Sequence, residues 1–419
     1  MASSCGPLSR LTKKQTMIAA GLALLLLLVI CISIGVPLAA ASKSSRSADS
    51  LETAKVILKT HALIDGHNDL PYRIRIYTGV NKTDFNSSLD KVWEVSQTDI
   101  PRLKEGMVGA QFWAAYVPCD TQFKDAVTKS LEQVDIIRNL VAKYPEIFEF
   151  VTTSQGIRDA FKAKKIASLI GLEGGHSIDS SLGTLRMFYE LGVRYMTVTH
   201  SCNTPWADNW LVDVNKTNEH DGLTDFGKKV IHEMNRLGML VDLSHVAVRT
   251  MEDALDESKA PVIFSHTSAY ALCNHYRNAP DAILKKTKQN RGVVMVNFYS
   301  DYINCYPSNQ TNATLSQVAD HIDHIKNVAG VETVGIGGDY DGVERLPIGL
   351  EDVSKYPDLF AELVKRGWSN DDLAKLAGEN LLRVFKAAEE VRDNMKDEAP
   401  SEARIPDSER GNSSCYKKF

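Results

Sequence analysis

The 419-residue sequence lacks the features that mark several common classes of protein. It has no basic stripe and no arginine-rich arm, and its net charge is −5, so we expect no nucleic-acid partner. No GxGxxG turn follows the first apolar run, which removes the usual sign of a dinucleotide-binding sheet. Hydrophobic content of 43% and charged content of 24% are those of an ordinary globular protein. The chemistry of the chain must therefore be sought in its motifs.

Charged residues are also absent from Met17 to Val36. At about 1.5 Å rise per residue, this run spans roughly 30 Å as a helix, which is the thickness of one bilayer core. Arg10, Lys13 and Lys14 precede the run and favour a cytoplasmic N-terminus. We therefore predict that this run crosses a membrane.

The N-terminal segments divide accordingly. We predict a cytoplasmic tail over residues 1–16, a transmembrane signal-anchor over 17–38 and a Ser/Ala-rich stalk over 39–50. The protein would then be a type II single-pass protein of the plasma membrane whose remaining residues are extracellular. The alternative is a cleaved signal peptide and a secreted protein, because PLAAAS offers small residues for cleavage. Signal h-regions usually run about 7–15 residues, which favours the anchor.

Two further features agree with export. Asn-x-Ser/Thr sequons, which accept N-linked glycans, begin at Asn81, Asn86, Asn215, Asn309, Asn312 and Asn412. Five of the seven cysteines follow the predicted span, namely Cys119, Cys202, Cys273, Cys305 and Cys415. In an oxidising compartment we expect them to form disulfide bonds. Because five is odd, one of them can pair with another chain.

Short apolar runs alternate with amphipathic stretches from Leu51 onward. Eight runs occur, at residues 62–65, 108–117, 166–173, 193–200, 239–245, 261–266, 292–299 and 333–339. Nearly continuous apolar strands separated by helices predict a parallel sheet that is buried on both faces. Eight such units fit a (β/α)8 TIM-like barrel over residues 51–390, and an open doubly wound sheet is the alternative. The polar residues 391–419 are predicted to form an extended tail.

Polar side chains of a particular kind end six of these runs. They are His67 and Asp69, Glu173, His200, His245, His266 and Asp339. Barrel active sites lie at the C-terminal ends of several strands, so these side chains are expected to meet. A single His after an apolar run is usually a turn or core residue, but the repetition at successive strand ends is not explained in that way.

The mixture of His and carboxylate without Cys is typical of zinc or another divalent transition metal. His67, Asp69, Glu173, His245 and His266 are too many ligands for one open zinc site. They suit two metals about 3.5–4 Å apart that share a bridging carboxylate. Such a pair holds a hydroxide at neutral pH, because bound zinc lowers the pKa of water to about 7. The implied chemistry is hydrolysis of an amide or ester, or phosphoryl transfer.

A different cluster resembles a ligand set but carries less weight. Asp320, His321, Asp323 and His324 lie within one amphipathic stretch. On a barrel helix they are expected to form part of the outer, solvated face.

Several motifs resemble the membrane (renal-type) dipeptidases, a family of zinc-dependent dipeptidases. They are LIDGHNDLPY, the stretch from GLEGGHSIDSS to PWADNW, VDLSH, PVIFSHTSAY and GIGGDYDGV. Their order and spacing agree with the family from about residue 52 to about residue 390. The likeness includes GLEDVSKYPDLFAELVKRGW, which carries no metal chemistry. The resemblance implies a (β/α)8-like barrel with two zinc ions per chain.

The resemblance also implies roles for the metal ligands. His67 and Asp69 would bind one zinc ion, His245 and His266 the other, and Glu173 would bridge the two.

Three further residues would act on the substrate. His200 would contact the substrate and help to stabilise the oxyanion, and Arg277 would pair with the C-terminal carboxylate of the substrate. Asp339 would be the general acid/base, although Asp341 is two residues away and is a rival for that role. The planar fork of an arginine fits a carboxylate bidentately, which makes the Arg277 assignment physically reasonable.

The family likeness also bears on the cysteines and on attachment. It implies the disulfides Cys119–Cys202 and Cys273–Cys305, which leaves Cys415 for an interchain bridge in a homodimer. Members are often held by a C-terminal lipid anchor, whose signal ends in a hydrophobic tail. This chain ends in NSSCYKKF, so the predicted N-terminal span is expected to replace that anchor.

The function implied is a cell-surface binuclear zinc dipeptidase that hydrolyses the peptide bond of dipeptides, extending to cysteinyl-glycine conjugates such as leukotriene D4. One alternative is a catalytically silent surface receptor or adhesion protein on the same barrel. Another is a binuclear amidohydrolase that acts on rings or phosphoesters, from which Arg277 distinguishes a dipeptidase.

Overall fold

The computed structural model describes residues 12–14, 17, 48–78, 89–217, 219–305, 311–407 and 409–410. The chain divides into two units, Met1–Glu52 and Thr53–Phe419, and the fold described below is that of the second unit. No helix within the described ranges has both the length and the apolarity needed to cross a bilayer. The predicted signal-anchor at 17–38 lies outside those ranges except for Met17.

Eight parallel strands close into a barrel. Strand β2 pairs with both β1 and β4, and the remaining neighbours pair in the order β4-β5-β6-β7-β8-β9-β1, which completes the ring. The strands are β1 Leu63–Asn68, β2 Val108–Tyr116, β4 Ile166–Glu173, β5 Val193–Thr197, β6 Leu240–Asp242, β7 Ile263–Phe264, β8 Val293–Val296 and β9 Val334–Ile336. Each coincides with one of the eight predicted apolar runs, so the predicted barrel is confirmed and the open sheet is excluded.

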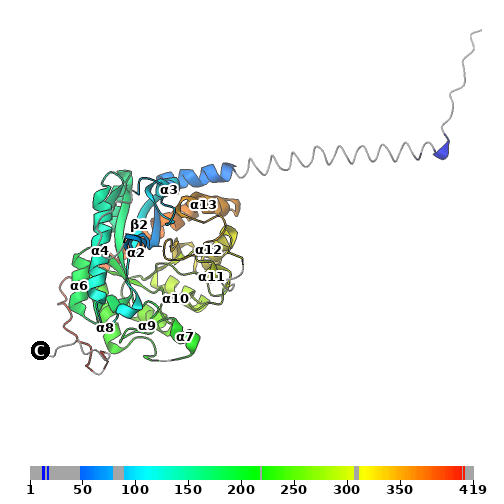
Figure 1. The fold of residues 1–419 in the computed structure, drawn as a ribbon. Helices are drawn as coiled ribbons and strands as arrows, with labels where there is room; N and C mark the ends of the chain where they lie inside the picture. The colour runs from blue at the N-terminus through cyan, green and yellow to red at the C-terminus, as the bar shows by residue number, and fades with distance from the viewer. Residues whose placement is uncertain are drawn as a thin grey trace, which may run out of the picture. The chain divides into compact units, whose positions relative to one another are not determined.

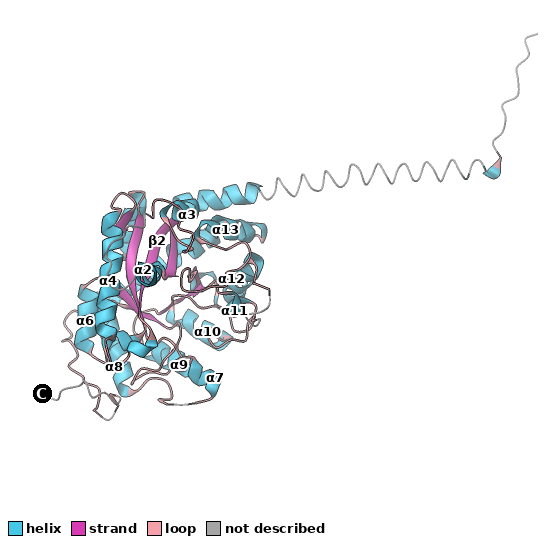
Figure 2. Ribbon diagram, in the orientation of Figure 1, coloured by secondary structure: helices cyan, strands magenta, loops and turns pink. Residues whose placement is uncertain are grey.

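Helices surround the strands (Figures 1 and 2). The longer ones are α2 Leu70–Thr78, α4 Ala126–Lys143, α5 Ser154–Lys162, α6 Leu182–Glu190, α8 Asp225–Leu237, α9 Val248–Glu257, α10 Asp281–Asn290, α12 Leu315–Ala329, α13 Tyr356–Lys365 and α15 Asn380–Asn394. Shorter ones are α3 Ile100–Glu105, α7 Leu211–Asn215, α11 Ser300–Ile303 and α14 Asn370–Ala374. This arrangement buries both faces of the sheet, as the continuous apolar strands require.

The helix ends follow from local chemistry. The side chains of Ser181, Thr224 and Thr314 accept the first free N–H groups of α6, α8 and α12. Thr314 and Gln317 form a reciprocal capping box. Helix α8 ends at Gly238 with φ 73°, a left-handed conformation that glycine adopts without a steric penalty.

One strand was not predicted. Strand β3, Phe148–Phe150, pairs with the first residues of β4, Ile166 to Ser168. Strand β5 takes over the pairing from Ile170 onward, so β3 extends the edge of β4 where β5 has not yet begun.

The ring of Tyr195 on β5 packs directly against the backbone of Gly171 on β4. A Cβ atom on Gly171 would lie 1.9 Å from Cζ of Tyr195, so only glycine leaves room for this ring. The ring is fully buried inside the barrel. It therefore brings a hydroxyl group into the barrel interior, beneath the strand ends.

The barrel closes between its first and last strands with the help of a buried carboxylate. The ladder between β1 and β9 has one register pair, Asp65 opposite Ile336. The Asp65 carboxylate accepts hydrogen bonds from the N–H groups of His67 (3.1 Å) and Gly338 (2.9 Å) and from the Tyr356 hydroxyl. This side chain thus supplies hydrogen bonds at a seam where the backbone ladder is short.

Helix α15 continues to Asn394, four residues into the predicted tail. Residues 399–406 have neither helix nor strand, yet Ile405 is buried and the backbone N–H of Ser401 donates to Glu233. The first part of the tail is therefore packed on the domain.

Candidate metal centre

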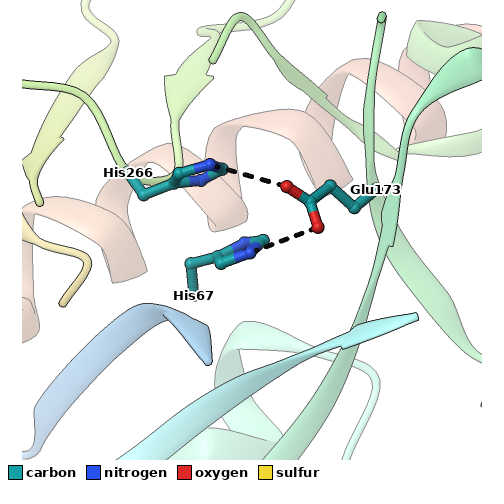
Figure 3. A group of neighbouring side chains, drawn as sticks. All are labelled: His67, Glu173 and His266. Carbon is teal, nitrogen blue, oxygen red and sulfur yellow. Dashed lines mark ion pairs between the residues drawn. The ribbon is translucent and has the colours of Figure 1, made fainter. Parts of the chain in front are cut away.

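Glu173 lies at the centre of the side chains that gather at the strand ends. Its Oε2 atom is 3.5 Å from Nε2 of His67, while its Oε1 atom is 3.2 Å from Nε2 of His245 and 3.6 Å from Nε2 of His266. Figure 3 shows the two carboxylate oxygens of Glu173 facing His67 and His266 separately. One carboxylate thus faces two separate sets of possible ligands, as a bridging group would.

His67 and Asp69 form the first set. Nε2 of His67 is 3.1 Å from Oδ2 of Asp69, and both side chains are buried. Asn68 turns the other way, where its Nδ2 donates to Oγ1 of Thr98 at 2.8 Å. This alternation is that of an extended strand, and it puts the two possible ligands on one face.

His245 and His266 form the second set. Their Nε2 atoms are only 2.8 Å apart. Burial lowers the pKa of both imidazoles, and the charge of Arg277 lowers them further, so both rings are neutral. Two neutral nitrogen atoms with a carboxylate oxygen beside them make a set of donors that suits a divalent transition metal.

Hydrogen bonds behind the rings fix which nitrogen is free. Nδ1 of His67 lies 2.9 Å from the Tyr195 hydroxyl, which itself donates to the carbonyl of Gly66 at 3.2 Å. The hydroxyl must therefore accept from Nδ1, which makes Nε2 the nitrogen that could bind a metal.

His266 is held in a similar way. Its Nδ1 lies 2.8 Å from Oγ of Ser265, and Ser265 donates to the buried Asp242 carboxylate at 2.6 Å. The sequence reasoning missed Tyr195, Ser265 and Asp242. The available signal was a carboxylate inside an apolar run, because a buried carboxylate needs partners.

The spacing and burial of these side chains indicate whether they could hold a metal. Groups of ligand atoms lie within 4.8 Å of one another in the sets His67–Glu173–His266, Glu173–His200–His245 and His67–Asp69–Asp339. Oδ1 of Asp69 is buried and has no hydrogen-bond partner within the described part of the chain. Carboxylates packed this closely repel each other unless a cation lies among them. The residues present therefore fit a metal centre.

A cleft of about 500 Å³ opens over the centre. Glu173, His200, His245, Arg277 and Asp339 contribute to its lining. Nε2 of His200 is 3.7 Å from Oε1 of Glu173, and the ring of His200 packs against Tyr116 with centroids 4.8 Å apart. The three predicted substrate-contacting residues thus share one cleft with the metal centre.

Arg277 is the most unusual group in this cleft. Its side chain is 1% exposed, and its Nε and Nη1 atoms have no hydrogen-bond partner among the described residues. No carboxylate in the described part of the chain forms an ion pair with it, and its guanidinium lies 5.3 Å from the ring centre of Tyr302. A buried cation without an anion is costly, so an anionic ligand at this group would lower that cost.

Asp339 and Asp341 have different surroundings. Asp339 has φ 63° and its N–H donates to the carbonyl of His67 at 3.2 Å, which holds it at the mouth of the barrel. Asp341 instead accepts hydrogen bonds from Ser96 (2.9 Å) and from the backbone N–H of Gln97 (2.9 Å). The carboxylate of Asp341 is therefore occupied in holding a neighbouring loop, whereas that of Asp339 faces the centre.

Burial and charge shift the titration of two groups in the cleft. Burial raises the pKa of Asp339 to about 8, opposed by His67 and assisted by the charges of Asp69 and Glu173. Burial lowers the pKa of His200 to about 3, so this imidazole is neutral at physiological pH. A neutral imidazole still has one N–H group, which can donate a hydrogen bond.

The cluster around residue 321 was interpreted partly wrongly. His321 is not on a solvated face: it is 1% exposed, its Nδ1 accepts the N–H of Ala269 at 3.0 Å, and its Nε2 lies 2.9 Å from the carbonyl of Ile303. His324 pairs with Asp281 at 2.7 Å. His321 therefore ties the loop at Ala269 and the end of α11 to α12.

Both intrachain disulfides implied by the family likeness are confirmed. Cys119 is bonded to Cys202 and Cys273 to Cys305, with Cα atoms 5.9 and 5.1 Å apart. The first bridge lies beside His200, since Sγ of Cys119 is 3.8 Å from Nδ1 of that ring. Cys415 lies outside the described residues.

Two of the six sequons fall on described residues. Asn215 is exposed at the end of α7, and Asn312 is half-buried and accepts a hydrogen bond from Arg345 at 3.2 Å. The remaining four, Asn81, Asn86, Asn309 and Asn412, lie outside the described residues.

Comparison with known proteins agrees with this geometry. The model of the membrane dipeptidase family, peptidase family M19, matches residues 51–399. Dipeptidase 3 of Mus musculus is 46% identical over 370 residues, which cover 87% of this chain and 72% of that protein. Dipeptidase 3 of Homo sapiens is 44% identical over 371 residues, covering 86% and 72%.

Solved structures share the fold. The probable dipeptidase PvdM of Pseudomonas aeruginosa has a TM-score of 0.72 at 21% identity, covering 82% of this chain and 99% of that one. The dipeptidase AC, a metallopeptidase of family M19, has a TM-score of 0.69 at 25% identity, covering 78% and 99%. The chain therefore belongs to the membrane dipeptidase family, peptidase family M19, and is a metal-dependent hydrolase that acts on dipeptides.

Proposed function

We propose that this chain is a binuclear zinc dipeptidase. His67 and Asp69 would bind one ion, His245 and His266 would bind the other, and Glu173 would bridge them. The opposed directions of the two Glu173 oxygens support this division, because each faces a different set of ring nitrogens. When bound, the ions supply a water of lowered pKa and polarise the scissile carbonyl.

The observation that carries the proposal is the unpaired, buried Arg277 in the same cleft as the metal centre. Its fork binds the C-terminal carboxylate of the substrate in two charge-assisted hydrogen bonds. Because the clamp is fixed beside the metals, only a short substrate can place its peptide bond over them. A dipeptide meets this condition, whereas a longer peptide would carry its terminal carboxylate too far from the scissile bond.

The remaining two residues act on protons and charge. Asp339 holds a proton at its carboxylate and delivers it to the leaving amine, a role that suits a carboxyl group whose pKa is raised by burial. His200 donates a hydrogen bond from its neutral ring to the oxygen of the scissile carbonyl as negative charge develops there. The buried walls of the cleft strengthen both interactions.

The proposal extends to substrate and setting. Cysteinyl-glycine conjugates such as leukotriene D4 end in a dipeptide with a free carboxylate, so Arg277 can recognise them in the same way. We propose a cell-surface location through the N-terminal span, N-glycosylation at the exposed Asn215 among other sequons, and a homodimer linked through Cys415.

A catalytically silent surface receptor is the competing function. A receptor would gain nothing from an unpaired buried arginine above packed carboxylates, both of which lower stability. Another amidohydrolase chemistry is disfavoured for the same reason, because a ring or phosphoester without a carboxylate leaves Arg277 unsatisfied.

The test is hydrolysis of a dipeptide panel by the purified chain with its zinc content measured in parallel. We expect about two zinc ions at the barrel centre and chelator-sensitive release of amino acids. Glu173→Gln should lower kcat at least about a thousandfold, because it removes the bridge. Normal turnover by that variant would refute the mechanism.

A further inference from the structure

A second group of possible metal ligands lies outside the barrel centre, in the loop between β5 and α8. Asp208, Glu219 and His220 each present a ligand atom, and these atoms lie within 4.8 Å of one another. Glu219 and His220 line a separate cavity of about 510 Å³. None of the five proposed ligands of the barrel centre contributes to that cavity, so this group is a distinct feature.

Asp208 is the least satisfied member of the group. It is 1% exposed, and its Oδ2 accepts the backbone N–H groups of His220 at 3.1 Å and Gly222 at 3.3 Å. Its Oδ1 is buried without a hydrogen-bond partner in the part of the chain that the structure describes. A buried carboxylate oxygen without a partner is costly, and a cation bound to it would remove that cost.

His220 has one nitrogen available for a metal. Its Nε2 lies 2.9 Å from the carbonyl oxygen of Thr204, which can only accept, so Nε2 carries the hydrogen. Nδ1 of this ring therefore has a free lone pair. A ligating histidine commonly has its other nitrogen anchored on a carbonyl in this way.

The electrostatic surroundings are negative. Within the described ranges, Arg249 pairs with Asp253 at 3.0 Å and not with Asp208 or Glu219, while Glu219 accepts a hydrogen bond from Asn203. Burial and the charge of Asp208 raise the pKa of the neighbouring Asp213. The local field thus favours a bound cation.

We propose that Asp208, Glu219 and His220 bind one divalent transition-metal ion of the zinc class, with water completing the coordination. One imidazole and two carboxylates suit zinc, whereas calcium takes oxygen ligands alone. The ion would fasten Asp208 to Glu219 and His220 across the β5–α8 loop. The same loop carries His200 and is already fixed near its start by the Cys119–Cys202 disulfide.

The test is the zinc content of the full chain and its variants by mass spectrometry of the metal after equilibration with micromolar zinc. Glu219→Gln and His220→Gln should each contain one zinc ion fewer than the unmodified chain. The matched control is His232→Gln, which changes a half-exposed histidine of α8 that pairs with Glu398 and should keep the full content. Zinc should also raise the Tm of the unmodified chain more than that of His220→Gln.

The result is separable from that of the barrel centre. If both proposals hold, the zinc content is three in the unmodified chain and two in His220→Gln. If the barrel centre holds no zinc, the numbers are one and zero, and the loop site still stands. Equal zinc contents in the unmodified chain, Glu219→Gln and His220→Gln would overturn the proposal, as would a site that fills with calcium and not with zinc.

Discussion

Replacing Arg277 with methionine separates substrate recognition from stability. Methionine has a similar length and no charge, so the change removes the proposed carboxylate clamp without opening a large cavity. Two hydrogen bonds to a charged group at roughly 1.5–3 kcal/mol each amount to about 3–4 kcal/mol once the partner is partly solvated. At 1.4 kcal/mol per factor of ten, kcat/KM for a dipeptide should fall by about 10²- to 10³-fold.

The assay compares a dipeptide with the same dipeptide amidated at its C-terminus. The unmodified enzyme should prefer the free carboxylate by the same 10²- to 10³-fold, and Arg277→Met should lose that preference. Arg73→Met is the matched control, because Arg73 also lines the cleft but already pairs with Asp341 at 3.8 Å. It should leave the preference in place.

The stability of Arg277→Met should move in the opposite direction from its activity. The guanidinium is buried without an anion, so removing the charge should leave Tm unchanged or raise it. An equal loss of activity toward both substrates, or a marked fall in Tm, would refute the reasoning, since either would mean that Arg277 supports the fold.

Three further outcomes are expected. Tyr195→Phe should weaken metal binding about 10- to 100-fold, because His67 loses the hydroxyl that orients it, and dialysis against graded chelator would measure this. Glu233→Gln should cost about 2 kcal/mol of unfolding free energy at pH 7, because the buried carboxylate holds Arg186 and Arg236 at 2.9 and 2.8 Å. Burial alone would raise the pKa of Glu233, but the two arginines lower it below its ordinary value of 4.5. The difference in unfolding free energy between Glu233→Gln and the unmodified chain should therefore have its full size above pH 4.5. It should disappear at lower pH, where the carboxylate of the folded protein is protonated, and denaturation at a series of pH values would measure this. Chelation should abolish dipeptide hydrolysis and lower Tm, and zinc but not magnesium should restore both.

The fold could be predicted because its strands are buried on both faces. Each apolar run from residues 62–65 to 333–339 became a strand, and the amphipathic stretches between them became helices. Strand β3 escaped because Phe-Glu-Phe is too short to give a period, and its pairing depends on where β5 begins. Helix α2 was hidden by Pro71, which is tolerated in the first turn, where its missing N–H has no partner to lose.

The candidate site could be predicted only in part. The repetition of His and carboxylate at strand ends identified the side chains that the barrel brings together. The hydroxyl of Tyr195 and the carboxylate of Asp242 could not be assigned, since their partners come from other strands. His321 was wrongly predicted to be solvated for a similar reason. The loop that covers it at Ala269 is distant in the sequence. Arg277 lacks an ion pair because no carboxylate in the described part of the folded chain lies close enough to it, and the sequence does not give those distances.

The contact between Asp65 and Gly338, where the barrel closes, can form only late in synthesis of the chain. The backbone N–H of Gly338 that binds this carboxylate is 273 residues further along the chain. At about 5–20 residues per second, translation of that interval takes roughly 14–55 s. His67 and Asp69 are therefore synthesised long before Asp339 and before the barrel can close. The site can assemble only when almost the whole domain has been synthesised. A fragment that lacks either end of the barrel cannot assemble the proposed centre, so activity should appear only after the barrel has closed.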